Sequence, residues 1–201
     1  DFGVKDASGQ ILLKNINIEL HTGDSLLIQG ASGTGKTTLL KALAGIYPFE
    51  TFGVAERACL EQPLFLPQRP YVPQGSLREA ICYPNLVVTD EQLKAAMQQC
   101  CLSKYVDSLD FDTDWQATLS PGELQRVAFV RILLAKPELI FLDETTSALD
   151  EPTEAILYQT IRSRLPNSII ISVGHRCTLQ QFHNKRINLS ERESYCCMNC
   201  R

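Results

Sequence analysis

The eight residues GASGTGKT, at positions 30–37, constrain the fold more than any other stretch of the sequence. They follow SLLIQ (25–29), a nearly continuous apolar run that is typical of a buried strand. They lead into KTTLLKALAGI (36–46), where leucine and alanine recur at helical spacing and a glycine stands near the end. A glycine-rich turn between a buried strand and a helix indicates a layered α/β core.

The same two patterns recur along the chain. Alternating or continuous apolar runs predict strands over 15–20, 138–144 and 167–175. Capping residues and helical periodicity predict helices over 89–101, 120–135 and 152–165. The order of these elements predicts an α/β fold in which a helical insertion occupies the middle of the chain.

The GASGTGKT stretch matches G-x-x-x-x-G-K-[ST] at every fixed position, which predicts a phosphate-binding loop. The glycines let backbone N–H groups point inward at phosphate oxygens, and the helix N-terminus adds a positive dipole end. Lys36 supplies a charge for the β- and γ-phosphates, and Thr37 a hydroxyl for Mg²⁺. The alternative is a glycine-rich turn without a ligand, which the flanking strand and helix disfavour. The residues predicted to bind nucleotide are Gly30, Ala31, Ser32, Gly33, Thr34, Gly35, Lys36, Thr37 and Thr38.

The run LIFLDE (139–144) predicts an apolar strand that delivers two consecutive carboxylates at its end. Asp143 is positioned to hold Mg²⁺, and Glu144 is then available to polarise an attacking water. The alternative is an acidic pair at an ordinary strand-to-loop junction. His175 and Gln68 also follow apolar runs, but a lone histidine or glutamine at such a place more often has a structural role.

The stretch LSPGELQR (119–126) predicts a well-made helix start. Ser120 can cap the helix, Pro121 suits its first position, and Glu123 can close a capping box. Gly122 lowers helix propensity in this first turn, which raises the question of what approaches the backbone there. A capped helix N-terminus that contains a glycine is a candidate anion site.

Composition excludes some functions. A net charge of −4 argues against broad binding of nucleic acid or of an anionic membrane. The most apolar stretch, 127–135, is too short to span a membrane and contains Arg131. The eight irregularly spaced cysteines favour free thiols, with a metal or redox role for Cys197 and Cys200 as the alternative. Because the chain begins at Asp1, we expect it to be part of a longer protein.

Together these motifs resemble the ATP-binding cassette of ABC transporters over nearly the whole chain. GASGTGKT is similar to the Walker A loop, LSPGE to the family signature and LIFLDE to the Walker B strand. SALD (147–150) resembles the D-loop. The form LSPGE, with FLPQRPYVPQGSLREAICYP and ISVGHR, is most similar to the peroxisomal-type D subfamily and its bacterial relatives, in which membrane and nucleotide-binding domains are fused.

The resemblance implies a P-loop NTPase (RecA-like) core with an antiparallel β part and an inserted helical subdomain. It implies a single nucleotide-binding domain over 1–201, with the core at about 1–68 and 137–189, the helical subdomain at about 69–136 and a tail at 190–201. It also implies an ATPase that uses ATP and Mg²⁺ and that drives transport as a head-to-tail dimer. The expected partners are a transmembrane domain, N-terminal in the same polypeptide, and a second copy of this domain, with no nucleic acid. The expected location is the cytoplasmic face of a membrane, the inner membrane in a bacterium.

The resemblance also assigns roles to residues. The implied catalytic residues are Glu144, His175, Lys36 and Gln68. The implied Mg²⁺ ligands are Thr37, Gln68 and Asp143. The implied contacts to the partner's ATP are Ser120, Pro121, Gly122 and Glu123, with Asp150 of the D-loop also acting across the interface.

One departure from the family concerns adenine. Asp6 occupies roughly the position of the usual adenine-stacking aromatic residue, and Phe2 is the only aromatic residue nearby. We therefore expect weak or absent stacking. Three other functions remain open: a soluble ABC-type machine acting on DNA or ribosomes, a catalytically silent regulatory module, and a P-loop kinase for small molecules. A machine acting on DNA or ribosomes would need a long coiled coil or a second cassette. A silent regulatory module would leave an intact Lys36 and Glu144 unexplained. A small-molecule kinase would leave LSPGE and SALD without a role.

Overall fold

The computed structural model describes residues 1–54, 63–189, 195–196 and 198–199. The chain divides into two compact units. The first, here called the sheet unit, comprises Asp1–Phe65, Glu138–Glu144 and Asn167–Arg201. The second, the helical unit, comprises Leu66–Pro137 and Thr145–Pro166. Cys197 and Cys200, the candidate metal or redox pair, lie outside the described residues.

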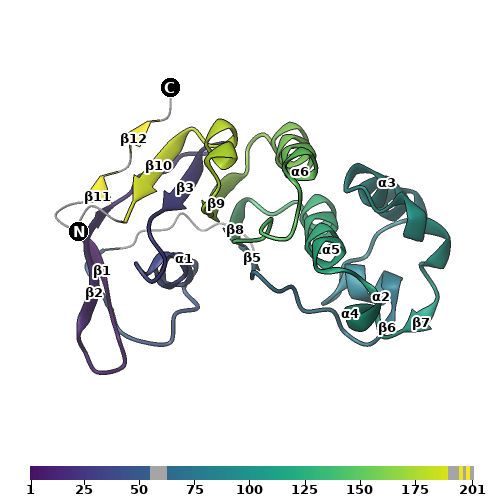
Figure 1. The fold of residues 1–201 in the computed structure, drawn as a ribbon, viewed down its shortest axis with the longest axis horizontal. Coiled ribbons are helices and arrows are strands. Elements are labelled where there is room, and N and C mark those ends of the chain that lie inside the picture. The colour runs from purple at the N-terminus through teal and green to yellow at the C-terminus, as the bar shows by residue number, and fades with distance from the viewer. Residues whose placement is uncertain (55–62, 190–194, 197, 200–201) are drawn as a thin grey trace. The chain divides into compact units, whose positions relative to one another are not determined.

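A six-stranded sheet forms the centre of the sheet unit, in the order β12-β10-β3-β9-β8-β5 (Figure 1). Neighbours in the series β10, β3, β9 and β8 run parallel, whereas β12 pairs antiparallel with β10. The strands are β3 (Ser25–Gln29), β5 (Leu64–Leu66), β8 (Leu139–Asp143), β9 (Ile169–Val173), β10 (Lys185–Asn188) and β12 (Met198–Asn199). Their parallel core confirms the predicted fold class.

A second sheet, in the order β11-β2-β1-β4, supplies the antiparallel part. Its strands are β1 (Phe2–Lys5), β2 (Ile11–Asn17), β4 (Thr51–Phe52) and β11 (Tyr195–Cys196). The strand predicted over 15–20 is therefore displaced toward the N-terminus. The physical reason is the extent of the pairing between β1 and β2. Lys5 lies opposite Ile11 and Phe2 lies opposite Ile16, so β1 has no residue to pair with much beyond Ile16.

Helix α1 (Lys36–Ala44) follows β3 and packs on the central sheet. It ends at Gly45, whose φ of 73° gives a left-handed cap that satisfies the last carbonyls. A short 3₁₀ segment, η2 (Cys177–Phe182), lies between β9 and β10. Apolar side chains from α1 and both sheets form one core, which includes Val4, Leu26, Ile28, Leu39, Leu40, Phe141, Val173 and Ile187.

The helical unit is built around α5, beside which α6 lies (Figure 1). Its elements are β6 (Gly75–Ser76), α2 (Leu77–Cys82), α3 (Asp90–Gln99), η1 (Ser103–Ser108), β7 (Asp112–Thr113), α4 (Trp115–Thr118), α5 (Pro121–Ala135) and α6 (Glu151–Arg164). Phe129 of α5 meets Tyr158 of α6 edge to face, with 6.1 Å between the ring centroids. The buried Arg131 of α5 donates to the carbonyl of Ala80 in α2 at 2.6 Å. No helix among the described residues is long and apolar enough to cross a membrane.

Candidate nucleotide site

The predicted phosphate-binding loop joins the carboxyl end of β3 to the first turn of α1. Gly33 and Gly35 have φ values of 78° and 91°, in the left-handed region that favours glycine. Lys36 is 5% exposed, and its ammonium donates to the carbonyls of Gly30, at 3.1 Å, and Ala31, at 2.8 Å. The loop is thus wrapped around its own lysine at a helix N-terminus, the arrangement that presents backbone N–H groups to phosphate.

Burial and neighbouring carboxylates act on Lys36 in opposite directions. Burial lowers the pKa of Lys36, and the carboxylates of Glu144 and Asp143 raise it. Burial has the larger effect, so the pKa lies below its ordinary value. A bound polyphosphate would add negative charge beside this ammonium and favour its charged form.

Asp143, the last residue of β8, accepts a hydrogen bond of 2.8 Å from the Thr37 hydroxyl to its Oδ1. Asp143 is only 6% exposed, and burial raises its pKa, although the Thr37 hydrogen bond lowers it. A buried carboxylate beside a hydroxyl is a donor set that suits a hard cation such as Mg²⁺, which takes few protein ligands and completes its shell with phosphate and water. The donor set therefore fits Mg²⁺.

Glu144 follows Asp143 and contacts His175. Its Oε1 lies 3.0 Å from Nε2 of His175, and its backbone N–H donates to Val173 O at 3.1 Å. Glu144 has a φ of 49°, which is unusual for a residue with a long side chain. Backbone strain of this kind often occurs at functional positions.

The parallel sheet explains why these groups meet. Strand β9 lies between β3 and β8, and Val173 is in register with both Ile28 and Asp143. The loop after β3, the carboxylates at the end of β8 and the histidine after β9 therefore emerge at one edge. The carboxyl edge of parallel strands is the usual ligand site of such sheets.

The LSPGE stretch begins α5 in the helical unit. Ser120 caps the helix, with its hydroxyl accepting from Glu123 N at 3.3 Å, and Glu123 Oε2 accepts from Ser120 N at 2.8 Å. The capping box predicted from the sequence is present. A Cβ added to Gly122 would lie 3.0 Å from Ala148 O and 3.3 Å from a Leu149 methyl. The close approach that Gly122 permits is thus, in this chain, to its own SALD loop.

Gln125, one turn further along α5, was missed by the sequence analysis. It is 3% exposed, donates to Ser147 Oγ at 3.1 Å, and accepts from Ala148 N at 3.0 Å. A longer contact of 3.4 Å joins its Nε2 to the backbone carbonyl of Gln68. One buried amide on the LSPGE helix thus touches two other predicted motifs, SALD and Gln68. The only signal in the sequence is a polar residue on an otherwise apolar helix face.

Asp150 and Gln68 complete the predicted positions in the helical unit. Asp150 is the N-cap of α6 and accepts from Thr153 N at 3.2 Å. The Gln68 side chain is exposed in the segment that follows β5. The structure therefore collects residues 30–38, Asp143, Glu144 and His175 in the sheet unit, and Gln68, LSPGE and SALD in the helical unit.

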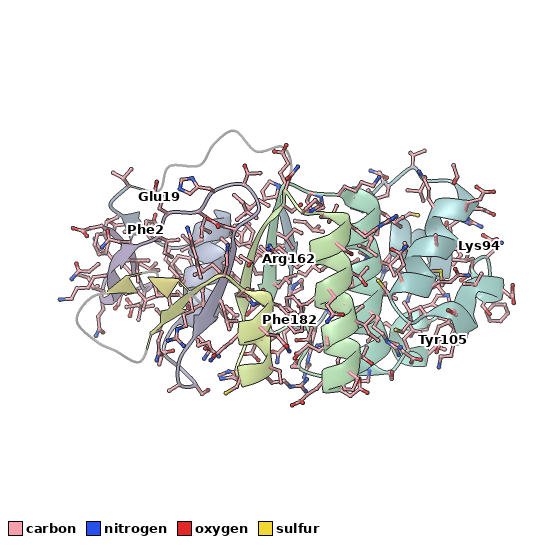
Figure 2. All side chains as sticks on the ribbon, turned by 90° about the horizontal axis from the view of Figure 1, so that it is seen from above. Phe2, Glu19, Lys94, Tyr105, Arg162 and Phe182 are labelled. Atoms are coloured by element: carbon pink, nitrogen blue, oxygen red, sulfur yellow. The ribbon has the colours of Figure 1, made fainter. Side chains whose placement is uncertain are left out.

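The structure bears on the expected lack of adenine stacking. Phe2 is 7% exposed and belongs to the apolar core, so its ring is occupied (Figure 2). Asp6 has a turn-forming role, because its Oδ1 accepts from Ser8 N at 2.8 Å and from Gln10 N at 3.0 Å. Neither residue presents an aromatic face to a base.

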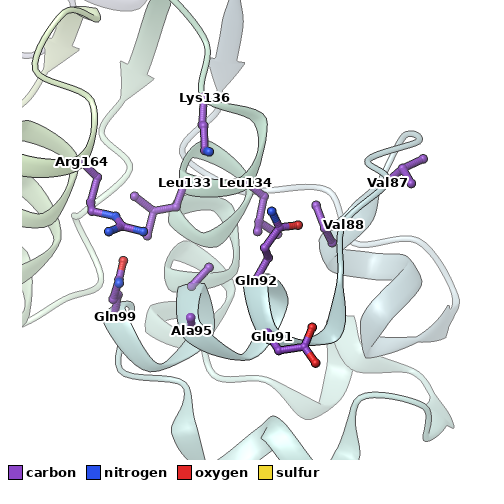
Figure 3. Close-up of a pocket in the computed structure, with 11 residues that line it drawn as sticks. Val87, Val88, Glu91, Gln92, Ala95, Gln99, Leu133, Leu134, Lys136 and Arg164 are labelled. Carbon is purple, nitrogen blue, oxygen red and sulfur yellow. The ribbon is translucent and has the colours of Figure 1, made fainter.

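A cavity of about 390 Å³ lies elsewhere, on the helical unit (Figure 3). Its walls come from α3, from the C-terminal turns of α5 and α6, and from the segment before α3. It contains none of the predicted site residues. Its lining residues are Val87, Val88, Glu91, Gln92, Ala95, Ala96, Gln99, Leu133, Leu134, Lys136 and Arg164.

Comparison with known proteins identifies the family. The family model described as ABC transporter matches residues 13–147. An uncharacterized ABC transporter ATP-binding protein of Haemophilus influenzae is 67% identical over 189 residues, which are 94% of this chain and 32% of that protein. The chloroplastic ABC transporter D family member 2 of Arabidopsis thaliana is 37% identical over 91% of this chain and 33% of its own length. The human lysosomal cobalamin transporter ABCD4 is 38% identical over 91% of this chain and 32% of its own length.

The fold and these matches define the class: the chain belongs to the ABC transporter family. It is an ATP-binding domain of that family, whose reaction is hydrolysis of ATP with Mg²⁺, and its relatives include D-subfamily members. The chain spans about a third of the length of the curated relatives it matches.

Proposed function

We propose that this chain is the nucleotide-binding domain of a transporter and that its ATP hydrolysis powers movement of a substrate across a membrane. The observation that carries the proposal is the group of Lys36, Thr37, Asp143, Glu144 and His175 at the carboxyl edge of one parallel sheet. The chain spans about a third of the length of these relatives, which leaves room for a transmembrane domain in the same polypeptide, and we place that domain before this one. The domain then works at the cytoplasmic face of the membrane, the inner membrane in a bacterium.

In the proposed domain, the core comprises about 1–68 and 137–189, the helical subdomain about 69–136 and the tail 190–201. The backbone N–H groups of residues 30–38 and the Lys36 ammonium bind the β- and γ-phosphates. Thr37, Asp143 and Gln68 would hold Mg²⁺, which when bound supplies positive charge to the phosphate oxygens.

Glu144 orients the attacking water and takes its proton, and His175 contacts the γ-phosphate. The 3.0 Å contact between Glu144 and His175 supports this division, because the imidazole can hold the carboxylate in one orientation. The phosphoryl group needs positioning and charge neutralisation more than covalent help. The proposed site supplies both from the loop and helix that follow β3 and from residues at or just after the ends of β8 and β9.

The second half of the proposed site comes from another copy of the domain. The α5 N-terminus is capped and polar, and this chain already has a phosphate site of its own at α1. We therefore place Ser120, Pro121, Gly122 and Glu123 of one copy against the γ-phosphate held by the other, with Asp150 acting across the same interface. In that state the Ser120 hydroxyl turns from its own helix to the partner's nucleotide.

The test is Glu144→Gln, with Glu138→Gln as the matched control at the other end of β8. Glu144→Gln should abolish ATP turnover, keep ATP bound, and elute from gel filtration as an ATP-loaded dimer. Glu138→Gln should turn over ATP like the unmodified chain, because Glu138 lies at the opposite edge of the sheet. Wild-type turnover by Glu144→Gln would contradict the assigned role.

A further inference from the structure

Tyr105 of η1 (labelled in Figure 2) contacts the last residue of the LSPGE stretch and the short helix that precedes the stretch. Its hydroxyl reaches Glu123, which follows the stretch's glycine, and its ring meets Trp115, in the short helix that precedes Leu119. We propose that Tyr105 is a positioning residue for ATP hydrolysis, which acts through Glu123 to hold Ser120 and the α5 N-terminus in the geometry that meets the partner's γ-phosphate. This inference rests on the proposed function of LSPGE.

The two oxygens of the Glu123 carboxylate bind two different segments of the chain. Its Oε2 accepts from Ser120 N at 2.8 Å and so belongs to the helix cap. Its Oε1 accepts from the Tyr105 hydroxyl at 3.0 Å and pairs with the Lys104 ammonium. Glu123 is only 6% exposed, and each of its two carboxylate oxygens accepts a hydrogen bond. A shift of η1 would therefore move the Glu123 carboxylate, which accepts the hydrogen bond from Ser120 N.

The ring of Tyr105 fixes the other flank. It meets Trp115 edge to face, with 5.7 Å between centroids and an interplanar angle of 86°. Trp115 is 3% exposed and donates from Nε1 to Phe111 O at 3.0 Å. The α4 helix that contains Trp115 ends at Thr118, two residues before Ser120. Tyr105 thus contacts both the helix before the LSPGE stretch and the last residue of that stretch.

The cations around Glu123 have an electrostatic consequence for phosphate binding. Burial opposes ionisation of Glu123, but hydrogen bonds from Lys104, Ser120 and Tyr105 outweigh burial and lower its pKa to about 2. Glu123 is therefore an anion at neutral pH. An unpaired anion in the first turn of α5 would repel an incoming phosphate, whereas Lys104 and the more distant Arg126, at 3.8 Å, offset that charge. The cluster keeps the helix N-terminus attractive to anions while the carboxylate holds the cap.

The experiment compares Tyr105→Phe with Tyr83→Phe in ATP turnover, ATP affinity and thermal unfolding. Tyr105→Phe retains the ring contact with Trp115 and removes only the hydroxyl that reaches Glu123. We expect turnover to fall about five- to tenfold, because the lost hydrogen bond is to a charged group. The ATP affinity of the domain should stay within about twofold of wild type, because Tyr105 does not itself contact the nucleotide. Tyr83→Phe removes a hydroxyl from the same unit outside the cluster and should leave turnover unchanged.

A second readout separates positioning through Glu123 from a general loss of structure. In a Glu123→Ala background, Tyr105→Phe should cause no further loss of turnover, because the group through which it acts is gone. The sole tryptophan of the sequence, Trp115, adds a spectroscopic signal: ATP-dependent association should change its emission in the wild type and change it less in Tyr105→Phe. Equal losses in both backgrounds, or wild-type turnover in Tyr105→Phe, would overturn the inference. If the wild type itself does not hydrolyse ATP, the proposed function fails instead.

Discussion

Thr37 and Asp143 are 106 positions apart in the sequence, yet a hydrogen bond of 2.8 Å joins their side chains. The contact exists because Thr37 stands in the first turn of the helix after β3 and Asp143 at the end of β8, both at the carboxyl edge of one sheet. The oxygens that would hold Mg²⁺ are thus brought together by the fold itself. Preorganised oxygens reduce the free energy needed to assemble the site when nucleotide arrives.

The first prediction concerns the Thr37 hydroxyl. Thr37→Val keeps the shape of the side chain but removes the oxygen, so we expect ATP turnover to fall about 100-fold and the Mg²⁺ concentration for half-maximal rate to rise. Thr37→Ser keeps the oxygen and should retain most of the turnover. Initial rates over a Mg²⁺ titration test this, and equal rates for the Val and Ser variants would refute the role of the hydroxyl.

A second prediction follows from the left-handed backbone of Glu144. A residue with a Cβ is less stable in the left-handed region than in the right-handed region, by about 1 kcal/mol or more. Glu144→Gly should therefore raise the free energy of unfolding by up to about 1 kcal/mol, reduced by the greater freedom of glycine in the unfolded chain, while abolishing turnover. Urea unfolding and ATPase assays on the same samples measure both effects.

The control for backbone strain is Lys136, the C-cap of α5, which has a φ of 48° and lies outside the predicted site. Lys136→Gly should also gain stability, by a similar amount, but should keep wild-type turnover. A Glu144→Gly variant that is less stable than wild type, beside a stabilised Lys136→Gly, would show that Glu144 makes stabilising contacts that exceed the backbone strain.

Local signals explain why much of the fold was predictable. Continuous apolar runs marked β3, β8 and β9, and cap residues such as Thr89 and Ser120 marked helix starts, because both depend on residues close in sequence. The extent of β2 was not predictable, since the position of its partner β1 sets it. The grouping of Asp143 and His175 follows from parallel strand order, but their individual contacts required the structure.

Contacts that depend on tertiary packing were beyond the sequence. Gln125 and Tyr105 carry no local signature, and their partners lie in other elements. Gly122 is instructive, because its presence suggested a close approach from outside, whereas the structure puts its own Ala148 carbonyl there. The two explanations are compatible, since a Cβ would crowd the same narrow region.

The third prediction tests that crowding. Gly→Ala in a helix ordinarily gains about 1 kcal/mol of stability. At Gly122 the added Cβ meets Ala148 O at 3.0 Å, so we expect Gly122→Ala to gain little or nothing in the free energy of unfolding and to lose turnover. Chemical denaturation measures the first effect. A variant that gains the full helix-propensity difference would show that the SALD loop yields without cost.

The fourth prediction concerns acid stability and Glu123. Its folded pKa of about 2 lies below the ordinary value of 4.5, so its stabilising contribution is full above about pH 4.5 and is lost as pH falls toward 2. The free energy of unfolding of wild type relative to Glu123→Gln should therefore shrink by about 1.4 kcal/mol between pH 7 and pH 3.5. Urea unfolding at both pH values measures this difference. A pH-independent difference would mean that Glu123 is not held as an anion.

In the proposed dimer, each ATP lies between the Walker loop of one copy and LSPGE of the other. Lys36→Ala and Ser120→Arg each remove one half of every site, so each variant alone should be inactive. An equal mixture should form about half mixed dimers, each with one intact site, and should recover about a quarter of the wild-type turnover. A mixture that stays as inactive as its components would contradict the head-to-tail site.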